Sequence, residues 1–122
     1  MIKYEDLLSV PYKRGGRDIS TGLDCYGFGI ECFRRAGKLL KDIAATPEGN
    51  LSEYVSSINA KEIYAYISDC GAQFLLGSDL HIGYMINKRE VLHMTDRGVR
   101  ITPVIALGKA RLFEVINDSD AV

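Results

Sequence analysis

The feature that most limits how this chain folds is the series of short alternating segments in its C-terminal half. From residue 73 onward, β-branched and other apolar residues alternate with polar ones, and turns containing Gly, Asn or Asp separate the segments. Connections this short join neighbouring strands in an antiparallel arrangement. The sequence therefore predicts an antiparallel sheet built from residues 73–76, 80–86, 90–95, 99–104 and 110–116.

The N-terminal half contains one strong helical pattern. Apolar or small residues recur at a helical spacing from Cys25 to about residue 43. Asp24 is a suitable N-cap residue, and the Thr46-Pro47 pair is a helix stop signal. We therefore expect a long helix that begins at Cys25 and buries one face against the sheet.

The other N-terminal segments give weaker signals. Residues 3–10 predict a short helix, residues 12–22 a turn-rich loop, and residues 48–67 contain both helical spacing and alternation. A chain of 122 residues suits one domain. A helix-rich half followed by antiparallel strands is an α+β layout, so we expect a single α+β domain over residues 1–122.

Composition gives no support to several classes of partner and location. The net charge of −1 gives no field that would attract nucleic acid or an anionic membrane, so neither is an expected partner. No apolar run approaches the roughly 20 residues that span a bilayer, and the first residues mix both charge signs, unlike a signal peptide. Three cysteines, Cys25, Cys32 and Cys70, form an odd, sparse set that favours reduced thiols and synthesis in the cytoplasm.

Both histidines of the chain fall in one predicted hairpin. A three-residue loop at 87–89 would place His93 opposite Gly83 and would project His81 and His93 from the same face, as diagonal neighbours. A two-residue loop would place them on opposite faces. The interpretation as a site therefore depends on an odd-length turn, and histidines that only pack within the sheet remain the alternative.

Cys25 is the third candidate. It lies in the first turn of the predicted helix, where unpaired N–H groups and the helix dipole favour a thiolate and lower the thiol pKa. A thiolate beside an imidazolium is the working pair of cysteine hydrolases. The alternative is an ordinary buried cysteine, which is the interpretation that we give to Cys32 and Cys70.

Three blocks of the chain resemble the motifs of one enzyme family. They are Pro-Tyr-Lys-Arg-Gly-Gly at 11–16 with Gly-Leu-Asp-Cys-Tyr-Gly at 22–27, His-Ile-Gly-Tyr-Met-Ile at 81–86, and Val-Leu-His-Met at 91–94. In this order they resemble the opening motif, the histidine strand and the following strand of the NlpC-like cell-wall cysteine peptidases. The resemblance covers about residues 7–101.

The resemblance implies a papain-like α+β fold, with the nucleophile-bearing helix packed on an antiparallel sheet. It also implies hydrolysis of amide bonds in peptidoglycan stem peptides, commonly the bond between D-γ-glutamyl and a diamino acid. Carried over by position, Cys25 is the nucleophile, His81 is the general base and then acid, and His93 orients His81. The implied chemistry needs no cofactor or metal.

The same resemblance implies a substrate-binding set around the nucleophile. The Tyr12 hydroxyl and the backbone N–H of Cys25 would stabilise the oxyanion, and Asp24 and Tyr26 would lie beside the substrate. Tyr26 stands where the family commonly has serine, and Asp-Cys-aromatic-Gly resembles the bacteriophage tail-associated branch. This implies phage tail proteins as partners, and a location in the virion tail from which the enzyme acts on the cell wall.

Two other functions use the same residues. Cys25, His81 and His93 are residue types that bind zinc, and catalytic zinc sites have three protein ligands and one open position. The domain could also be a tail assembly module whose hydrolytic chemistry is weak or silent. These alternatives stay open on the sequence alone.

Overall fold

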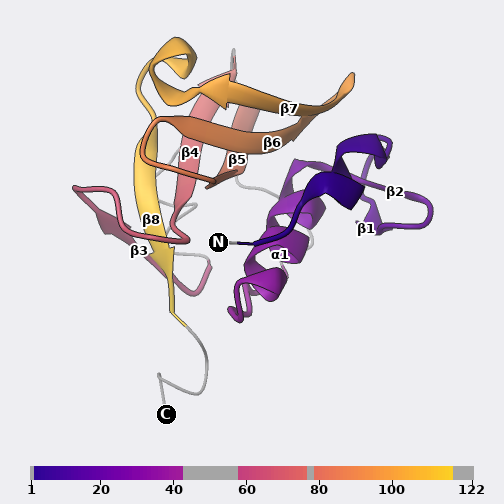
Figure 1. Cartoon of the computed structure of the whole chain (residues 1–122), viewed down its shortest axis with the longest axis horizontal. Helices are drawn as coiled ribbons and strands as arrows, with labels where there is room; N and C mark the ends of the chain where they lie inside the picture. Colours follow the sequence, from indigo (N-terminus) through magenta and orange to yellow (C-terminus); the bar gives the residue numbers. More distant parts are fainter. Residues whose placement is uncertain (1, 43–57, 77–78, 117–122) are drawn as a thin grey trace.

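The computed structural model describes residues 2–42, 58–76 and 79–116. Within these residues the chain forms eight strands, one α-helix and two short 3₁₀ helices (Figure 1). In chain order they are η1 (Glu5–Ser9), β1 (Arg17–Asp18), β2 (Gly22–Leu23), α1 (Cys25–Arg35), β3 (Ala60–Ile63), β4 (Gly71–Leu76), β5 (Asp79–Met85), β6 (Glu90–Thr95), β7 (Gly98–Pro103), η2 (Val104–Leu107) and β8 (Arg111–Val115).

The strands form two sheets. β1 and β2 make a small antiparallel pair, and the other six form a sheet of order β3-β8-β4-β5-β6-β7 in which all neighbours are antiparallel. The sheet bends strongly, because β6 and β7 run across the direction of β4 and β8 (Figure 1). All five predicted strands are confirmed, with ends that differ by at most two residues. Alternation identified them because most of these strands bury at least one face.

The expected α+β, papain-like fold is wrong. The described residues form a small β-rich domain, with eight strands in two sheets and a single α-helix. The expected helix-rich half is absent from these residues, because α1 ends at Arg35 and the loop predicted at residues 12–22 contains β1 and β2. The segment 43–57, on which part of the helical expectation fell, lies outside the described residues.

The ends of α1 follow from two local signals. The Asp24 carboxylate accepts a hydrogen bond of 2.6 Å from the Gly27 N–H, which confirms Asp24 as the N-cap. At the other end, Lys38 N–H donates to Phe33 C=O at 2.8 Å and Gly37 N–H donates to Arg34 C=O at 3.0 Å. This is a Schellman motif around a glycine with φ of +80°. The expected helix to residue 43 is wrong because Gly37 ends it.

Replacing Gly37 with alanine is expected to destabilise the protein. A Cβ built there meets no described heavy atom within 4 Å, so left-handed backbone strain is the whole cost, about 1–2 kcal/mol. Gly37→Asn should lose less, since asparagine tolerates this conformation better. Urea denaturation of the three proteins measures the order, and an alanine variant as stable as wild type would contradict this account of the helix end.

α1 packs on β5 and β6. Its buried face shares one core with one face of the sheet, and the Phe33 ring lies 5.4 Å from the Tyr84 ring, edge to face. A Cβ on Gly29 would come within 2.5 Å of Ile82 Cδ1, so the missing side chain lets β5 approach the helix closely. None of the described helices is long and apolar enough to cross a membrane.

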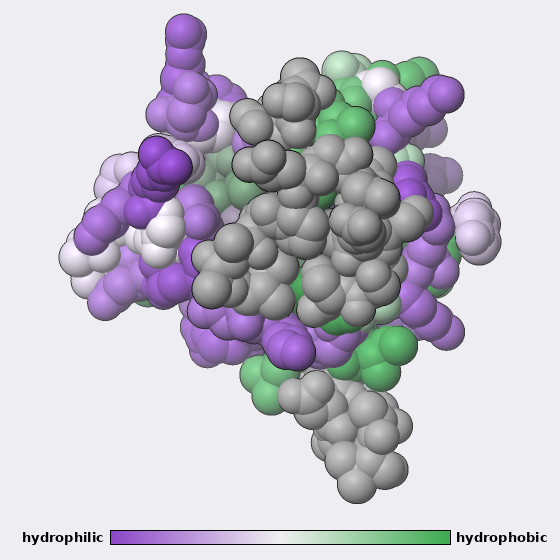
Figure 2. All heavy atoms as spheres, turned by 180° about the vertical axis from the view of Figure 1, so that it is seen from behind, coloured by the Kyte–Doolittle hydropathy of each residue, from purple (hydrophilic) through white to green (hydrophobic). Residues whose placement is uncertain are grey.

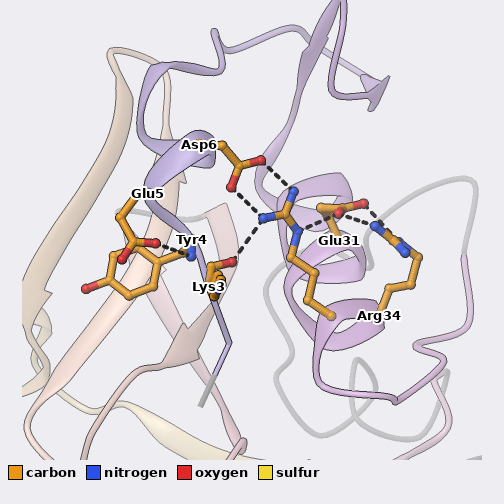
Figure 3. Close-up of polar contacts among 7 residues, drawn as sticks. Lys3, Tyr4, Glu5, Asp6, Glu31 and Arg34 are labelled. Atoms are coloured by element: carbon orange, nitrogen blue, oxygen red, sulfur yellow. Dashed lines mark hydrogen bonds and ion pairs between the residues drawn. The ribbon is translucent and has the colours of Figure 1, made fainter.

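An arginine on α1 fixes the N-terminal segment to the helix (Figure 3). Arg35 binds both carboxylate oxygens of Asp6, at 2.6 and 2.8 Å, and donates to the Lys3 carbonyl at 2.9 Å. Its Nε donates to Glu31 at 2.7 Å, and Arg34 binds the same carboxylate. This network holds η1 beside α1, and the η1 residue Leu7 is buried in the shared core.

Candidate functional site

The β5–β6 hairpin has the predicted register. Tyr84 pairs with Leu92 and Met85 with Val91, and Ile86 N–H donates to Glu90 C=O at 3.1 Å across a loop at residues 87–89. The odd-length turn is therefore confirmed. The Asn87 side chain closes this turn, because its Oδ1 accepts from the N–H groups of Arg89 and Glu90 at 2.8 and 2.9 Å.

This register places the two histidines on the same face of the sheet. A Cβ built on Gly83 would lie 3.1 Å from the Cβ of His93 and 2.3 Å from the Val91 side chain. Gly83 thus leaves the space that His93 and Val91 occupy. Alternation puts His81 on this same face, which is opposite the face that packs on α1.

His93 is held in a buried pocket within the sheet. It is 3 % exposed, and its Nε2 lies 2.9 Å from the Thr102 hydroxyl on β7. Its Nδ1 is buried and has no hydrogen-bond partner among the described residues. Burial lowers the pKa of His93 from its ordinary 6.5 to about 4, and the charges of His81 and Arg100 act in the same direction. His93 is therefore neutral at pH 7.

The lowered pKa of His93 predicts a loss of stability in mild acid. The unfolded chain takes up a proton near pH 6.5, whereas folded His93 resists protonation until about pH 4. The free energy of unfolding should therefore fall as pH drops through this window, by about 3 kcal/mol in total. Urea denaturation of wild type and His93→Gln from pH 7.5 to 4.5 measures it. The variant should show a weaker pH dependence, and equal slopes would contradict the assignment.

His81 is half-buried on β5, and its Nδ1 is a buried atom. In the β4–β5 register it lies directly opposite Phe74. The two rings stack, with centroids 5.9 Å apart and an interplanar angle of 17°. Phe74 also meets the His93 ring edge to face, at 5.5 Å and 83°. One fully buried phenylalanine thus contacts both imidazoles.

The Cys25 sulfur lies where β5 and β6 separate. In an antiparallel strand, every second N–H points the same way, so the Ile82 N–H points toward β6 like that of Ile86, which donates to Glu90. The described β5–β6 ladder does not continue as far as Ile82. Its N–H instead hydrogen-bonds to the Cys25 sulfur. The first residue of α1 therefore places its thiol against β5, at the residue next to His81.

The expected low pKa of Cys25 is wrong. Burial raises the pKa of this thiol above its ordinary value, and the charge of Asp24 raises it further. The N–H groups of Ile82 and Tyr26 and the charge of Arg17 lower the pKa without cancelling the effect of burial. The sequence could not show this. It indicates where the helix begins, but it does not indicate that the folded protein buries the sulfur. The free thiol is thus protonated at pH 7.

Cys25 should still react first with a small alkylating reagent. It is half-buried, whereas Cys32 and Cys70 have no exposed surface, and burial raises the pKa of those two thiols as well. Access then decides the order. Timed labelling with iodoacetamide at pH 8, read by peptide mass analysis, should modify Cys25 at least about tenfold faster. Equal rates at the three cysteines would contradict the placement of Cys25.

The other predicted site residues differ in their burial and in their contacts. Tyr12 is half-exposed. Its backbone pairs with that of Leu23, which lies two residues before Cys25 in the chain. Asp24 caps α1 and forms an ion pair with Arg17 at 2.7 Å. Tyr26 is 1 % exposed, and its hydroxyl donates to the Lys41 carbonyl. In this structure Tyr26 therefore packs and anchors the chain after α1, and does not line an open surface.

Sequence reasoning missed two residues of this region, Phe74 and Thr102. Phe74 gave only a strand signal, and its position opposite His81 depends on the β4–β5 register. Thr102 contacts His93 across the β6–β7 ladder. No three His, Cys, Asp or Glu side chains in the described part of the chain could hold a metal ion, so the alternative zinc site at Cys25, His81 and His93 is not formed.

Seen from behind, the end of the molecule that carries β1 and β2 is covered mainly by hydrophilic residues (Figure 2). The exposed charged residues of the segment before α1 include Lys13, Arg14 and Arg17.

In comparisons with known proteins, neither a family model nor a curated protein matches this chain.

Proposed function

We propose that this protein is a cysteine hydrolase that cleaves amide bonds in peptides, with Cys25 as nucleophile and His81 as its base. One observation carries the proposal: the Cys25 sulfur, at the start of α1, accepts the Ile82 N–H in the opening between the two strands that bear His81 and His93. The sulfur thus lies at the backbone of the residue next to His81, and a thiol paired with an imidazole at a helix N-terminus is the arrangement that thiol hydrolases use.

In the proposed reaction the thiol proton moves to His81 as the sulfur attacks, because the raised pKa of Cys25 disfavours a thiolate before substrate binds. The sulfur forms a bond to the scissile carbonyl carbon. His81 then gives its proton to the leaving amine as the C–N bond breaks. Water, deprotonated by His81, hydrolyses the thioester and restores the thiol. The Cys25 N–H and the Tyr12 hydroxyl are the proposed oxyanion donors.

For His93 we propose a role other than the orienting role that the resemblance implies. Its Nε2 contacts Thr102, and it stays neutral because it is buried. A second positive charge beside His81 would oppose protonation of His81 during the reaction, and the low pKa of His93 prevents this. We therefore propose that His93 supports His81 by remaining uncharged and by packing on Phe74.

The proposed substrate is the stem peptide of peptidoglycan, cleaved between D-γ-glutamyl and a diamino acid. Its support is the similarity of the Asp24–Gly27, His81–Ile86 and Val91–Met94 blocks to the motifs of NlpC-like peptidases. The Asp-Cys-Tyr-Gly sequence favours action from a bacteriophage tail, where tail proteins would be the partners. The cutting site and the partners both follow from this similarity.

The test is digestion of purified peptidoglycan by the wild-type chain, followed by mass analysis of the released fragments. We expect fragments that end at D-γ-glutamyl and new peptides that begin with the diamino acid. Peptidoglycan that stays intact after prolonged incubation with folded protein would overturn the proposal. Fragments cut in the glycan strand would replace it with another activity.

A tail assembly module with weak hydrolytic chemistry is the second candidate. It is favoured by the raised pKa of Cys25 and by the His93–Thr102 contact, since both weaken the resemblance to an activated triad. Assembly of tails in which this chain carries Cys25→Ala distinguishes the two. Normal assembly with lost peptidoglycan cleavage supports the enzyme, whereas normal assembly and unchanged infection support the module.

A further inference from the structure

Phe74, a residue outside the predicted triad, contacts both of its imidazoles. Phe74 is fully buried on β4, on the sheet face that also carries His81 and His93. Its ring stacks on the His81 imidazole at 5.9 Å and meets the His93 ring edge to face at 5.5 Å. The register fixes this contact, because Phe74 and His81 are direct partners in the β4–β5 ladder.

The face of a phenyl ring carries partial negative charge and attracts a cation within about 6 Å of its centroid. The His81 ring centroid lies 5.9 Å from that of Phe74, within this range, and the two ring planes are nearly parallel, at 17°. Such a contact favours the protonated imidazole over the neutral one. The edge-to-face contact with His93 at the same time limits rotation of the Phe74 ring.

We propose that Phe74 is a positioning residue that orients the His81 imidazole and stabilises its protonated form through the face of the phenyl ring. In the proposed hydrolase, on which this catalytic role rests, His81 carries the extra proton between nucleophilic attack and departure of the amine. In this proposal Phe74 supplies the stabilisation of charge that a carboxylate gives in many triads.

Among the described residues, His93 on β6 is coupled to His81 by charge, Arg100 on β7 lies opposite His93, and the Cys25 sulfur meets the N–H of Ile82, the residue after His81. On the face that β4 shares with His81, Ala72 and Phe74 contribute no charge. Arg100 and any positive charge on His93 would oppose protonation of His81. A comparison in which only residue 74 changes therefore isolates the contribution of the phenyl ring.

The first test is an NMR titration of the His81 ring in wild type, Phe74→Leu and Phe74→Tyr. The midpoint should fall by about 0.5–1 pH unit in the leucine variant and stay close to wild type in the tyrosine variant, which keeps an aromatic face. Phe113→Leu is the matched control. Phe113 is equally buried, but it packs on Phe33 in the core that α1 shares with the sheet. An equal change in the two leucine variants would overturn the proposal.

Leucine at position 74 could prevent folding, and a second series avoids this. Mono-, di- and trifluorinated phenylalanine at position 74 keep the ring shape while progressively removing negative charge from its face. The His81 midpoint should fall stepwise along the series, and an unchanged midpoint would contradict the proposal. This titration needs no substrate. It therefore tests Phe74 separately from the hydrolase, whose own failure would appear as uncut peptidoglycan.

The kinetic consequence is a fall in kcat with little change in KM. Along the fluorinated series, kcat for peptide release should fall about three- to tenfold, because protonation of His81 occurs after substrate binding. A rise in KM with constant kcat would assign Phe74 to substrate binding and would overturn the positioning role.

Discussion

Replacement of Cys25 by alanine is expected to lower kcat for peptide release by a factor on the order of 10⁶, the effect of removing the nucleophile from a hydrolase. In the proposed reaction this sulfur is the atom that bonds to the scissile carbonyl carbon, so the covalent route is lost with it. The fold should persist, because Cys25 is half-buried and α1 keeps its Asp24 cap. Fragment release measured by mass analysis, beside thermal unfolding by circular dichroism, checks both points.

Cys32→Ala is the matched control for this variant. Cys32 is fully buried on the same helix, in the core shared with the sheet. Its replacement leaves a small cavity and should lower the melting temperature while leaving kcat close to that of wild type. Full activity in Cys25→Ala, or an equal loss of activity in both variants, would show that the sulfur of Cys25 has no chemical role.

Replacement of His81 by glutamine is the second large effect. Glutamine keeps polar atoms at the position but cannot accept the thiol proton, so kcat should fall by about 10²–10⁴, the usual contribution of a general acid–base group. The remaining rate should rise with pH as more Cys25 ionises without help. A pH series of kcat for wild type and variant measures this difference.

His93→Gln separates the two histidines. His93 is neutral and bound to Thr102, so its replacement should reduce kcat less than His81→Gln does, and should change the pH dependence of stability more. A larger kinetic loss in His93→Gln than in His81→Gln would reverse the roles that we propose for the two rings.

The parts of this structure that the sequence predicted correctly are those set by local patterns. Alternation located the strands, Asp24 marked the start of α1, and the loop at 87–89 fixed the register that puts His81 and His93 on the same face. In each case the physical cause lies within a few residues of its effect. Gly37 was also a local signal, since glycine after a helical run is a common helix end, but the apolar spacing beyond it favoured a longer helix.

What the sequence did not show depends on contacts between distant segments. The β-rich fold follows from β8 inserting between β3 and β4, which no local pattern fixes. The raised pKa of Cys25 follows from burial after packing, and the stacking of Phe74 on His81 follows from the β4–β5 register. A helix start alone therefore predicted a reactive thiolate where the folded protein holds a protonated thiol.

Covalent trapping of the nucleophile is the most direct test of the proposed site. The reagent is a chloromethyl ketone whose carbonyl replaces that of the D-γ-glutamyl bond, and intact-mass and fragment analysis then locate the adduct. The account predicts one adduct for each chain, on Cys25, formed much more slowly in His81→Gln and absent in Cys25→Ala. Labelling at the same rate in wild type and His81→Gln, or an adduct on Cys32 or Cys70 in place of Cys25, would contradict it.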